Sequence, residues 1–285
     1  MRRILPWARR LRGPLWDYWV APAGRIRVTR YHVESPAWEG DSVTVALVSD
    51  IHAIAPAMSS DRIARVVART NALGAELILL LGDYVRAHWM GRPLSEAEIA
   101  QGLAGLAAPL GVHAVLGNHD WQEDPVAHRR QAGPVAMGEA LEAVGIPVLE
   151  NEAVLIERPG GAFWLAGLGD QRAFRTRPRR GVDDLAATLR AIGPEGPAIL
   201  MAHEPDIFPE VPARVALTVS GHTHGGQIRI FGQTPVVPSR FGSRYVYGHI
   251  REDGRDLVVS GGLGCSSLPL RLGVIPEIVL VRLSR

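Results

Sequence analysis

The sequence contains no lysine and a single cysteine, Cys265, and these two shortages restrict the kinds of site that it can build. One cysteine excludes an intrachain disulfide and a four-cysteine zinc site, so any bound metal must be held by nitrogen and oxygen. The lack of a disulfide suits a reducing compartment. Because lysine is missing, arginine carries all the side-chain positive charge apart from histidine, and the formal net charge is only +2.

The sequence also lacks a long apolar run. No run reaches the roughly 18 residues that a membrane-spanning helix needs, and the N-terminus lacks the apolar centre of a signal peptide. We therefore expect a cytoplasmic protein. No basic stripe interleaved with aromatic residues is present, which argues against nucleic acid as a partner. Hydrophobic residues make up 47% of the chain and charged residues 21%, as in an ordinary globular protein.

Residues 1–24 differ in composition from the rest, and we expect them to form a separate segment ahead of one domain over residues 25–285. Apolar side chains recur there at helical spacing, with arginines largely on the other side. These apolar residues are Ile4, Trp7, Leu11, Leu15 and Tyr18. The pattern is typical of a basic amphipathic helix that lies on an anionic membrane, here the inner face. The alternative is a helix that packs its aromatic face on the main domain.

From residue 43 onward, apolar strand-like segments alternate with amphipathic helical ones. Strands are predicted over residues 43–49, 76–81, 112–116, 148–150, 154–157, 162–168, 198–202, 215–220, 227–230, 245–247, 256–260 and 277–282. Helices are predicted over residues 61–73, 95–108, 138–144 and 183–192. This alternation favours an α/β fold with a mostly parallel first sheet, and the strand-rich tail favours a second, mixed sheet.

Five of these predicted strands end in side chains that bind metals. The residues are Asp50 and His52, Asp83, Asn118 with His119 and Asp120, His203, and His222 with His224. Taken singly, each would be interpreted as a helix cap or a turn residue. Open α/β sheets place their ligand sites at the carboxyl ends of strands, so we expect the whole set to converge.

The chemistry of this set points to divalent cations. Carboxylate, amide and imidazole groups without sulfur suit manganese, zinc or iron. Seven candidate ligands are too many for one ion but suit two divalent metal ions bridged by a carboxylate, an arrangement used in phosphoryl chemistry. Asp50 and His52 are separated by one residue, as are His222 and His224. In an extended segment this spacing would direct both side chains of each pair to the same side.

In this order the motifs resemble those of the calcineurin-like metallophosphoesterase superfamily. The resemblance covers about residues 43–285 and rests on Asp50-Ile51-His52, Gly82-Asp83, Gly117-Asn118-His119-Asp120, His203 and Gly221-His222-Thr223-His224. Residues 225–228 and 260–264 are similar to a bacterial, often membrane-associated, phosphodiesterase-like branch. The resemblance implies a four-layer α/β/β/α sandwich of two mixed sheets flanked by helices.

The resemblance also implies roles for the individual residues. Asp50, His52 and His224 would bind a first ion, Asn118, His203 and His222 a second, and Asp83 would bridge the two ions. His119 would be the catalytic histidine, and Asp120 would orient it. The implied reaction is an in-line attack on phosphorus by a hydroxide that bridges the two ions, with His119 as the general acid.

The predicted function is a dinuclear metal-dependent phosphoester hydrolase, either a phosphodiesterase or a pyrophosphatase. The basic N-terminus and an arginine loop over residues 172–180 favour a lipid-linked or nucleotide-sugar substrate, for example UDP-2,3-diacylglucosamine. That loop can equally be a solvated surface segment, and Asp170 before it can approach the site or cap a turn. The alternatives for the whole chain are a nuclease or cyclic-nucleotide phosphodiesterase, and a metal-stabilised scaffold without catalysis.

Overall fold

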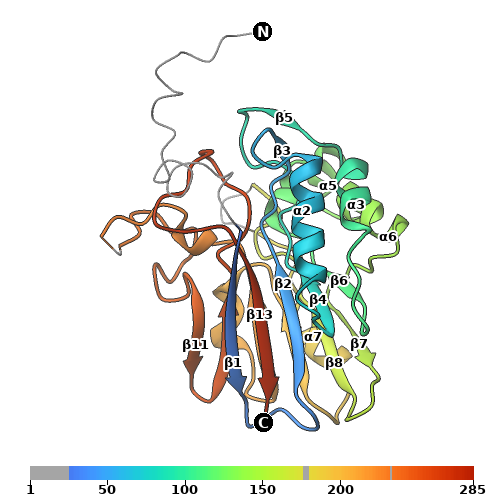
Figure 1. Cartoon of the computed structure of the whole chain (residues 1–285). Coiled ribbons are helices and arrows are strands. Elements are labelled where there is room, and N and C mark those ends of the chain that lie inside the picture. The colour runs from blue at the N-terminus through green and yellow to red at the C-terminus, as the bar shows by residue number, and fades with distance from the viewer. Residues whose placement is uncertain (1–25, 176–179, 232) are drawn as a thin grey trace.

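The computed structural model describes residues 26–175, 180–231 and 233–285 (Figure 1). The amphipathic helix predicted for residues 1–24 therefore lies outside the described residues, as do Arg177 and Arg179 of the arginine loop. None of the helices in the described ranges has the length and the apolar character that a bilayer-spanning helix requires.

The first sheet has the strand order β1-β13-β2-β4-β6. Its strands are β1 (Arg27–Glu34), β13 (Glu277–Ser284), β2 (Val43–Val48), β4 (Leu77–Leu80) and β6 (Val112–Ala114). The strands β2, β4 and β6 are parallel neighbours, whereas β13 runs antiparallel to β2. The sheet is therefore mixed, and the outermost strand, β1, was not predicted.

The second sheet has the order β11-β12-β10-β9-β8-β7. Its strands are β11 (Gly248–Glu252), β12 (Arg255–Val259), β10 (Val215–Ser220), β9 (Ala198–Met201), β8 (Phe163–Gly167) and β7 (Glu152–Ile156). The four inner strands are parallel, and the two edge strands are antiparallel to their neighbours. A separate two-stranded antiparallel sheet is formed by β3 (Ile54–Ala55) and β5 (Arg92–Pro93).

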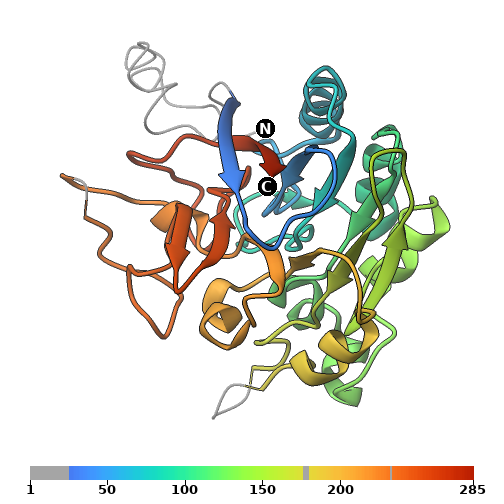
Figure 2. The same cartoon turned by 90° about the horizontal axis from the view of Figure 1, so that it is seen from below.

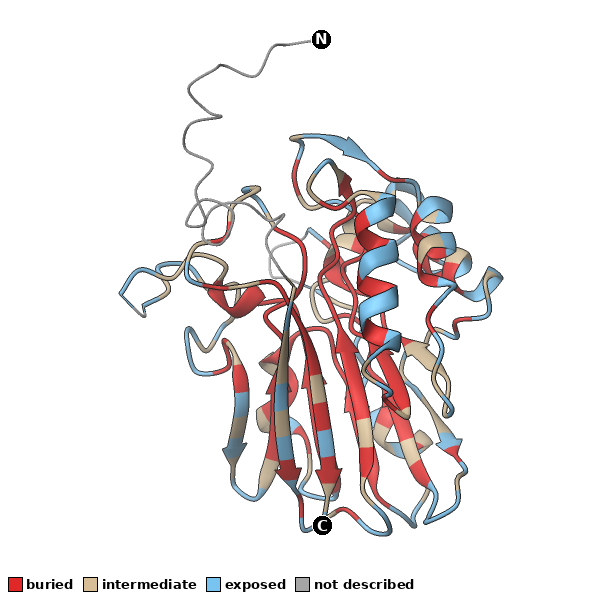
Figure 3. Cartoon of the chain, in the orientation of Figure 1, coloured by how far each residue is buried: buried red, intermediate tan, exposed pale blue. Residues whose placement is uncertain are grey.

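The central strands β2, β4, β9 and β10 are almost entirely apolar because both faces of each sheet are covered there. Along β2, Val45 and Leu47 point into the core between the sheets, whereas Ala46 and Val48 point into the core under the helices. This alternation follows from the two-residue period of a strand. Figure 3 shows both sheets buried along most of their length.

Helices cover the outer faces of both sheets (Figures 1 and 2). On the first sheet these are α2 (Ser60–Asn71), α3 (Glu96–Leu103) and α6 (Ala136–Ala143), which share one core with β2 and β4. On the second sheet α7 (Leu185–Ala191) and the 3-10 helix η2 (Pro205–Glu210) share a core with β8 and β9. The α/β/β/α sandwich of two mixed sheets is thus confirmed.

Some predicted elements were wrong in type or extent. Residues 227–230 form only isolated bridges, because Gln227 adopts a left-handed conformation after the short helix η3 (His224–Gly226). Residues 148–150 contribute one bridge, and residues 245–247 lie before β11, which begins at Gly248. The helix α3 begins with a capping box formed by Ser95 and Glu98, but it ends at Leu103 and not at residue 108. The short helices α4 (Asn118–Gln122) and α5 (Pro125–Arg130) were not predicted.

Candidate metal centre

The loops that follow β2, β4, β6, β9 and β10 meet at one edge of the two sheets, and they bring all seven predicted ligands together. Backbone hydrogen bonds join these loops directly. Asp50 N–H donates to Gly82 O at 3.0 Å, His52 N–H donates to Asp83 O at 3.0 Å, and Gly221 N–H donates to His203 O at 3.0 Å. The ligand side chains are therefore carried by a continuous hydrogen-bonded framework and not by independent loops.

Five of the seven residues adopt a left-handed backbone conformation. They are Asp50 (φ 52°), His52 (φ 45°), Asp83 (φ 58°), His222 (φ 67°) and His224 (φ 53°). The expectation that both one-residue spacings lie in extended segments was therefore wrong. Non-glycine residues seldom adopt this conformation, which costs of order 1–3 kcal/mol each, and such strain gathers at functional sites. The framework of loop-to-loop hydrogen bonds is what holds it.

The first group of side chains is formed by Asp50, His52 and His224. His52 Nε2 lies 3.0 Å from His224 Nε2, and the two rings are stacked with their centroids 4.9 Å apart. His224 Nε2 lies 3.4 Å from Asp50 Oδ1. The three side chains are buried, and their ligand atoms all lie within 4.8 Å of one another.

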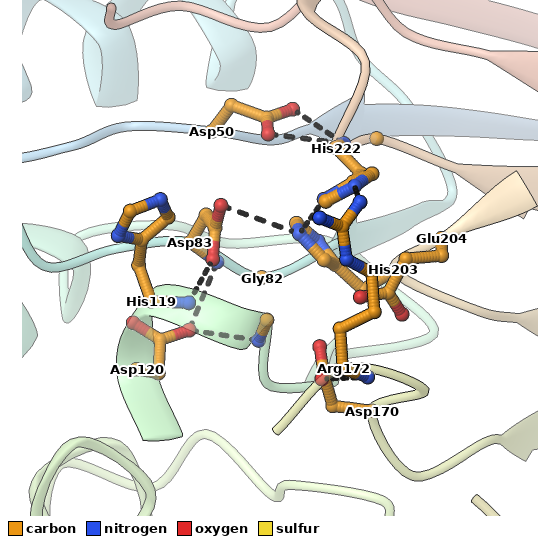
Figure 4. Close-up of polar contacts among 12 residues, drawn as sticks. Asp50, Gly82, Asp83, His119, Asp120, Asp170, Arg172, His203, Glu204 and His222 are labelled. Carbon is orange, nitrogen blue, oxygen red and sulfur yellow. Dashed lines mark hydrogen bonds and ion pairs between the residues drawn. The ribbon is translucent and has the colours of Figure 1, made fainter. Parts of the chain in front are cut away.

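The second group is formed by Asp83, His203 and His222, with Asn118 beside it. His203 Nε2 lies 3.3 Å from Asp83 Oδ2 and 3.2 Å from His222 Nδ1. The same Asp83 oxygen lies 3.5 Å from His52 Nε2 of the first group. Asp83 therefore contacts both groups through one oxygen atom; Figure 4 shows it between His119 and His203.

The hydrogen bonds of two imidazoles fit metal binding. His52 Nδ1 lies 3.0 Å from Val85 O, and His203 Nδ1 lies 2.6 Å from Leu81 O. A carbonyl oxygen only accepts hydrogen bonds, so the outer nitrogen of each of these rings carries a proton and the inner nitrogen points toward the other ligands. The inner nitrogens of His52 and His224 lie 3.0 Å apart and those of His203 and His222 lie 3.2 Å apart, so the ring nitrogens of each group converge.

Two further observations agree with a cationic occupant. Asn118 Oδ1 is buried and has no hydrogen-bond partner among the described residues, although a buried acceptor normally has one. Burial raises the pKa of Asp50 to about 6, a rise that His203 opposes and Asp83 reinforces. Burial also lowers the pKa of His52 to about 3. Divalent cations stabilise buried carboxylates that lie beside imidazoles, so the residues fit two such ions.

The outer nitrogens of His224 and His222 each face a guanidinium, that of Arg271 for His224 and that of Arg172 for His222. Arg271 Nη2 lies 3.1 Å from His224 Nδ1, and the same guanidinium donates to Gly264 O and Gly261 O, each at 2.7 Å. Arg271 is buried and holds the 261–264 loop against the first group. Sequence reasoning missed this residue, because nothing near position 271 signals a partner that lies 47 residues earlier.

His119 lies at the edge of the cluster. Its backbone N–H donates to Asp83 Oδ1 at 2.8 Å, and its ring meets the His52 ring edge-on with the centroids 5.1 Å apart. Its Nδ1 is buried and has no partner among the described residues. The histidine is thus anchored through its backbone, while its ring borders the cavity beside the ligands.

Asp120 does not make the predicted contact with the His119 ring. Its two oxygens instead accept four backbone N–H groups, from Asp83 and Gly117 at 2.9 Å and from Tyr84 and Val85 at 2.9 and 3.1 Å. The expected orienting role is therefore wrong. Neighbouring residues of a helix point about 100° apart, so Asp120 in α4 faces the loop after β4 while His119 faces the cavity.

A cavity of about 480 Å³ opens onto the cluster. One side carries polar groups, including Asp83, Asn118, His119, His222 and His224. The apolar part of the lining comes from two loops; its residues are Ile228, Pro235, Val236, Pro238 and Leu268. Arg172 borders the cavity, with Nη1 2.7 Å from His222 Nε2. The cavity therefore combines metal-type ligands, one cation and an apolar wall.

The other predicted polar residues have mixed outcomes. Asp170 Oδ1 accepts Arg172 N–H at 2.7 Å, which is the expected turn contact. Its second oxygen is buried without a partner among the described residues, as is Glu204 Oε1, and both carboxylates lie close to His203. Burial raises the pKa of Asp170 well above its ordinary value, and Glu204 raises it further. Sequence reasoning did not single out Glu204.

The sandwich and the two groups of ligands define a dinuclear metal-dependent hydrolase. The family model for calcineurin-like phosphoesterases matches residues 43–226, a stretch that contains all seven clustered residues and His119. The chain belongs to this family, whose members hydrolyse phosphoesters at a pair of metal ions.

Curated relatives agree with this membership. Phosphodiesterase YaeI of Escherichia coli is 34% identical over 223 residues, which are 74% of this chain and 73% of that protein. A putative metallophosphoesterase of Caenorhabditis elegans, F40B5.2, is 31% identical over 253 residues, and an uncharacterized metallophosphoesterase of Aquifex aeolicus is 29% identical over 265 residues. These alignments cover 86% and 90% of this chain, and 49% and 91% of the two relatives. The chain thus spans about half the length of the C. elegans relative.

Proposed function

We propose that this chain hydrolyses phosphodiesters at a centre of two ions. In this proposal Asp50, His52 and His224 hold one ion, Asn118, His203 and His222 hold the other, and Asp83 is shared. The observation that carries it is the position of Asp83 Oδ2, which lies 3.5 Å from His52 Nε2 and 3.3 Å from His203 Nε2. A single carboxylate oxygen beside both groups is what a bridging ligand requires.

When bound, divalent ions lower the pKa of a water molecule and offset the charge that develops on the phosphoryl oxygens. Manganese, zinc and iron all suit this mixture of nitrogen and oxygen ligands. The chain itself supplies His119, whose ring borders the cavity beside Asp83. Burial lowers the pKa of His119, so the protonated ring is a stronger acid but is a smaller fraction of the population at neutral pH. We assign His119 as the general acid from its position at the cavity beside the ligands.

The apolar wall supports an amphiphilic substrate. Ile228, Val236 and Leu268 face the ligands across the same cavity, so a substrate whose phosphorus reaches the ions places an adjoining group against aliphatic side chains. Arg172 offers a cation for a further phosphoryl oxygen on that substrate. A lipid-linked phosphodiester or pyrophosphate fits this arrangement, with UDP-2,3-diacylglucosamine as one candidate.

A nuclease or cyclic-nucleotide phosphodiesterase receives less support. Proteins that bind single strands or free bases usually stack them on aromatic side chains. Among the described residues, no phenylalanine, tyrosine or tryptophan lines the cavity. The wall beside the ions thus offers aliphatic contact and not a stacking platform.

The test is a substrate panel with the purified chain loaded with manganese, zinc or iron. We expect hydrolysis of bis-p-nitrophenyl phosphate to exceed that of the monoester p-nitrophenyl phosphate and of single-stranded DNA, with UDP-2,3-diacylglucosamine as the amphiphilic member of the panel. A preference for the monoester would refute the diester assignment. Complete inactivity at two bound ions per chain would instead favour a scaffold without catalysis.

A further inference from the structure

The large apolar side chains that are exposed are not spread evenly over the described surface. Seven such residues are exposed, and five of them lie on three loops at the edge that carries the metal cluster. These five are Trp89 (80% exposed), Ile230 (47%), Phe231 (102%), Val236 (77%) and Leu268 (51%). We call this set the apolar rim. Exposed apolar residues that gather in one region mark a surface that contacts something other than water.

Hydrogen bonds join the three loops into one surface. The side chain of Gln227 donates to Ser266 O at 2.8 Å and to Leu268 O at 3.1 Å, and it accepts Ser266 N–H at 2.7 Å. Ser267 N–H donates to Ala87 O at 3.2 Å, which ties the loop that carries Leu268 to the loop that carries Trp89. These hydrogen bonds therefore fix the positions of the three loops that carry the rim.

Phe231 lies at the tip of a tight turn. Ile230 and Gln233 exchange both backbone hydrogen bonds, at 2.9 and 3.0 Å, and Phe231 between them has a φ of 51°. Turns of this kind favour asparagine or glycine, and a bulky residue at positive φ is strained. A strained and fully exposed phenylalanine contributes nothing to the core, so its environment must come from outside the domain.

Two rim residues, Val236 and Leu268, line the catalytic cavity. Phe231 lies on the same loop as Val236, and Trp89 lies on the loop that is hydrogen-bonded to the Leu268 loop; neither of them lines the cavity. The described chain also begins nearby, because Arg27 in β1 contacts the Tyr247 hydroxyl and Tyr247 lies under the guanidinium of Arg229 at 5.9 Å. The 25 residues before that point contain six arginines, three tryptophans and one aspartate.

We infer that the apolar rim docks this domain on an anionic lipid bilayer, with the catalytic cavity facing the lipid headgroups. The partner is a membrane because the exposed aromatic and aliphatic tips occur in a chain whose first 25 residues are strongly basic in composition. A lipid surface offers the matching combination of apolar interior and negative headgroups. The inference concerns the orientation of the domain and does not depend on which phosphoester is cleaved.

Vesicle flotation with the full chain tests the rim. The double variant Phe231→Asp, Trp89→Asp should lose about tenfold or more of its binding to vesicles of phosphatidylcholine with about one quarter phosphatidylglycerol. The matched control is Leu155→Asp, since Leu155 is similarly exposed on β7 but lies outside the rim, and it should bind like the unchanged chain. All three proteins should hydrolyse the soluble diester equally, so loss of docking is distinguished from loss of the proposed chemistry.

A second measurement locates the tip directly. In Phe231→Cys, a nitroxide can be attached selectively, because the only other cysteine, Cys265, is buried. We expect its paramagnetic relaxation by oxygen to rise on binding to vesicles, which places the tip below the headgroups. The inference is overturned if the nitroxide remains in water, if the double variant floats like the unchanged chain, or if Leu155→Asp loses binding to the same extent. It is also overturned if light scattering shows that the rim pairs two copies of the chain.

Discussion

The carboxylate of Asp120 accepts the backbone N–H of Asp83 at 2.9 Å. Asp83 has a left-handed backbone, and its Oδ2 lies beside an imidazole of each ligand group. Asp120 also accepts the N–H groups of the next two residues, Tyr84 and Val85. A buried carboxylate on α4 therefore holds the strained turn from which the shared aspartate projects. Asp120 therefore stabilises the backbone at Asp83 and does not orient the His119 ring.

Replacement of Asp120 by asparagine should destabilise the fold. The amide has one acceptor oxygen in place of two, and its NH₂ group would face N–H donors. We expect the free energy of unfolding to fall by about 2–4 kcal/mol, since buried donors are left unpaired. Urea unfolding measures the change. The same substitution type on the surface, Glu142→Gln, should change stability by no more than about 0.5 kcal/mol, and an equal loss in both variants would contradict the assignment.

His119→Ala and Asp83→Asn should separate catalysis from metal binding. Loss of the general acid should lower kcat by about 10²- to 10⁴-fold while both ions stay bound. Loss of the shared carboxylate should reduce the occupancy of both sites together, because Asp83 contacts both groups. Elemental analysis of the two purified variants gives the answer. Equal metal loss in both would show that these roles are wrongly assigned.

Gly117→Ala should disturb the metal centre through sterics alone. A Cβ at this position would lie 2.6 Å from Asp83 N and 2.7 Å from His203 Cε1, so two ligand residues would have to move. We expect metal affinity to fall about tenfold or more, measured by calorimetric titration with manganese. Gly138→Ala is the control, since its Cβ would meet only Leu116 Cδ1, at 3.4 Å. Unchanged metal affinity in Gly117→Ala would contradict the close packing of Gly117 against Asp83 and His203.

Chelation should lower thermal stability. Ions that bind only the folded chain and are present at about 100 times their Kd add about 2.7 kcal/mol to the free energy of unfolding. Their removal should therefore lower Tm by about 5–10 °C for a domain of this size. A thermal scan before and after EDTA, followed by manganese, measures the effect. Asp83→Asn should show much less dependence on EDTA. If both proteins respond to the chelator alike, the ions bind elsewhere.

Acid should remove a stabilising contribution at Asp256. His249 Nε2 and Arg251 Nε lie 2.6 and 2.9 Å from its Oδ1. Burial alone would raise the pKa of Asp256, but these hydrogen bonds outweigh burial and hold the pKa below its ordinary value. The contribution is therefore complete above about pH 4 and is lost as the pH falls through the lower, folded-state pKa. Urea unfolding of Asp256→Asn and the unchanged chain should differ at neutral pH and converge in acid; a constant difference would contradict this.

The apolar strands and the chemistry of the ligands could be predicted from the sequence. Segments such as 43–48 and 215–220 are apolar at every position or nearly so, which indicates strands buried on both faces. The ends of parallel strands meet at one edge of a sheet, so the residues that follow several strands were expected to converge. These signals are local in the chain, and for that reason they predicted a mostly parallel first sheet, a mixed second sheet and a centre made of nitrogen and oxygen ligands.

The contacts that hold the ligands in place could be found only in the tertiary structure. They join residues that are far apart in the sequence, or they depend on the direction in which a side chain points. Arg271 meets His224 across 47 residues, and β1 pairs with β13 at the other end of the chain. Asp120 turns away from His119 because adjacent helical residues diverge. The left-handed turns at the ligands are held by hydrogen bonds between loops. Aspartate and histidine have too weak a local preference for this conformation for the turns to be predicted from the sequence.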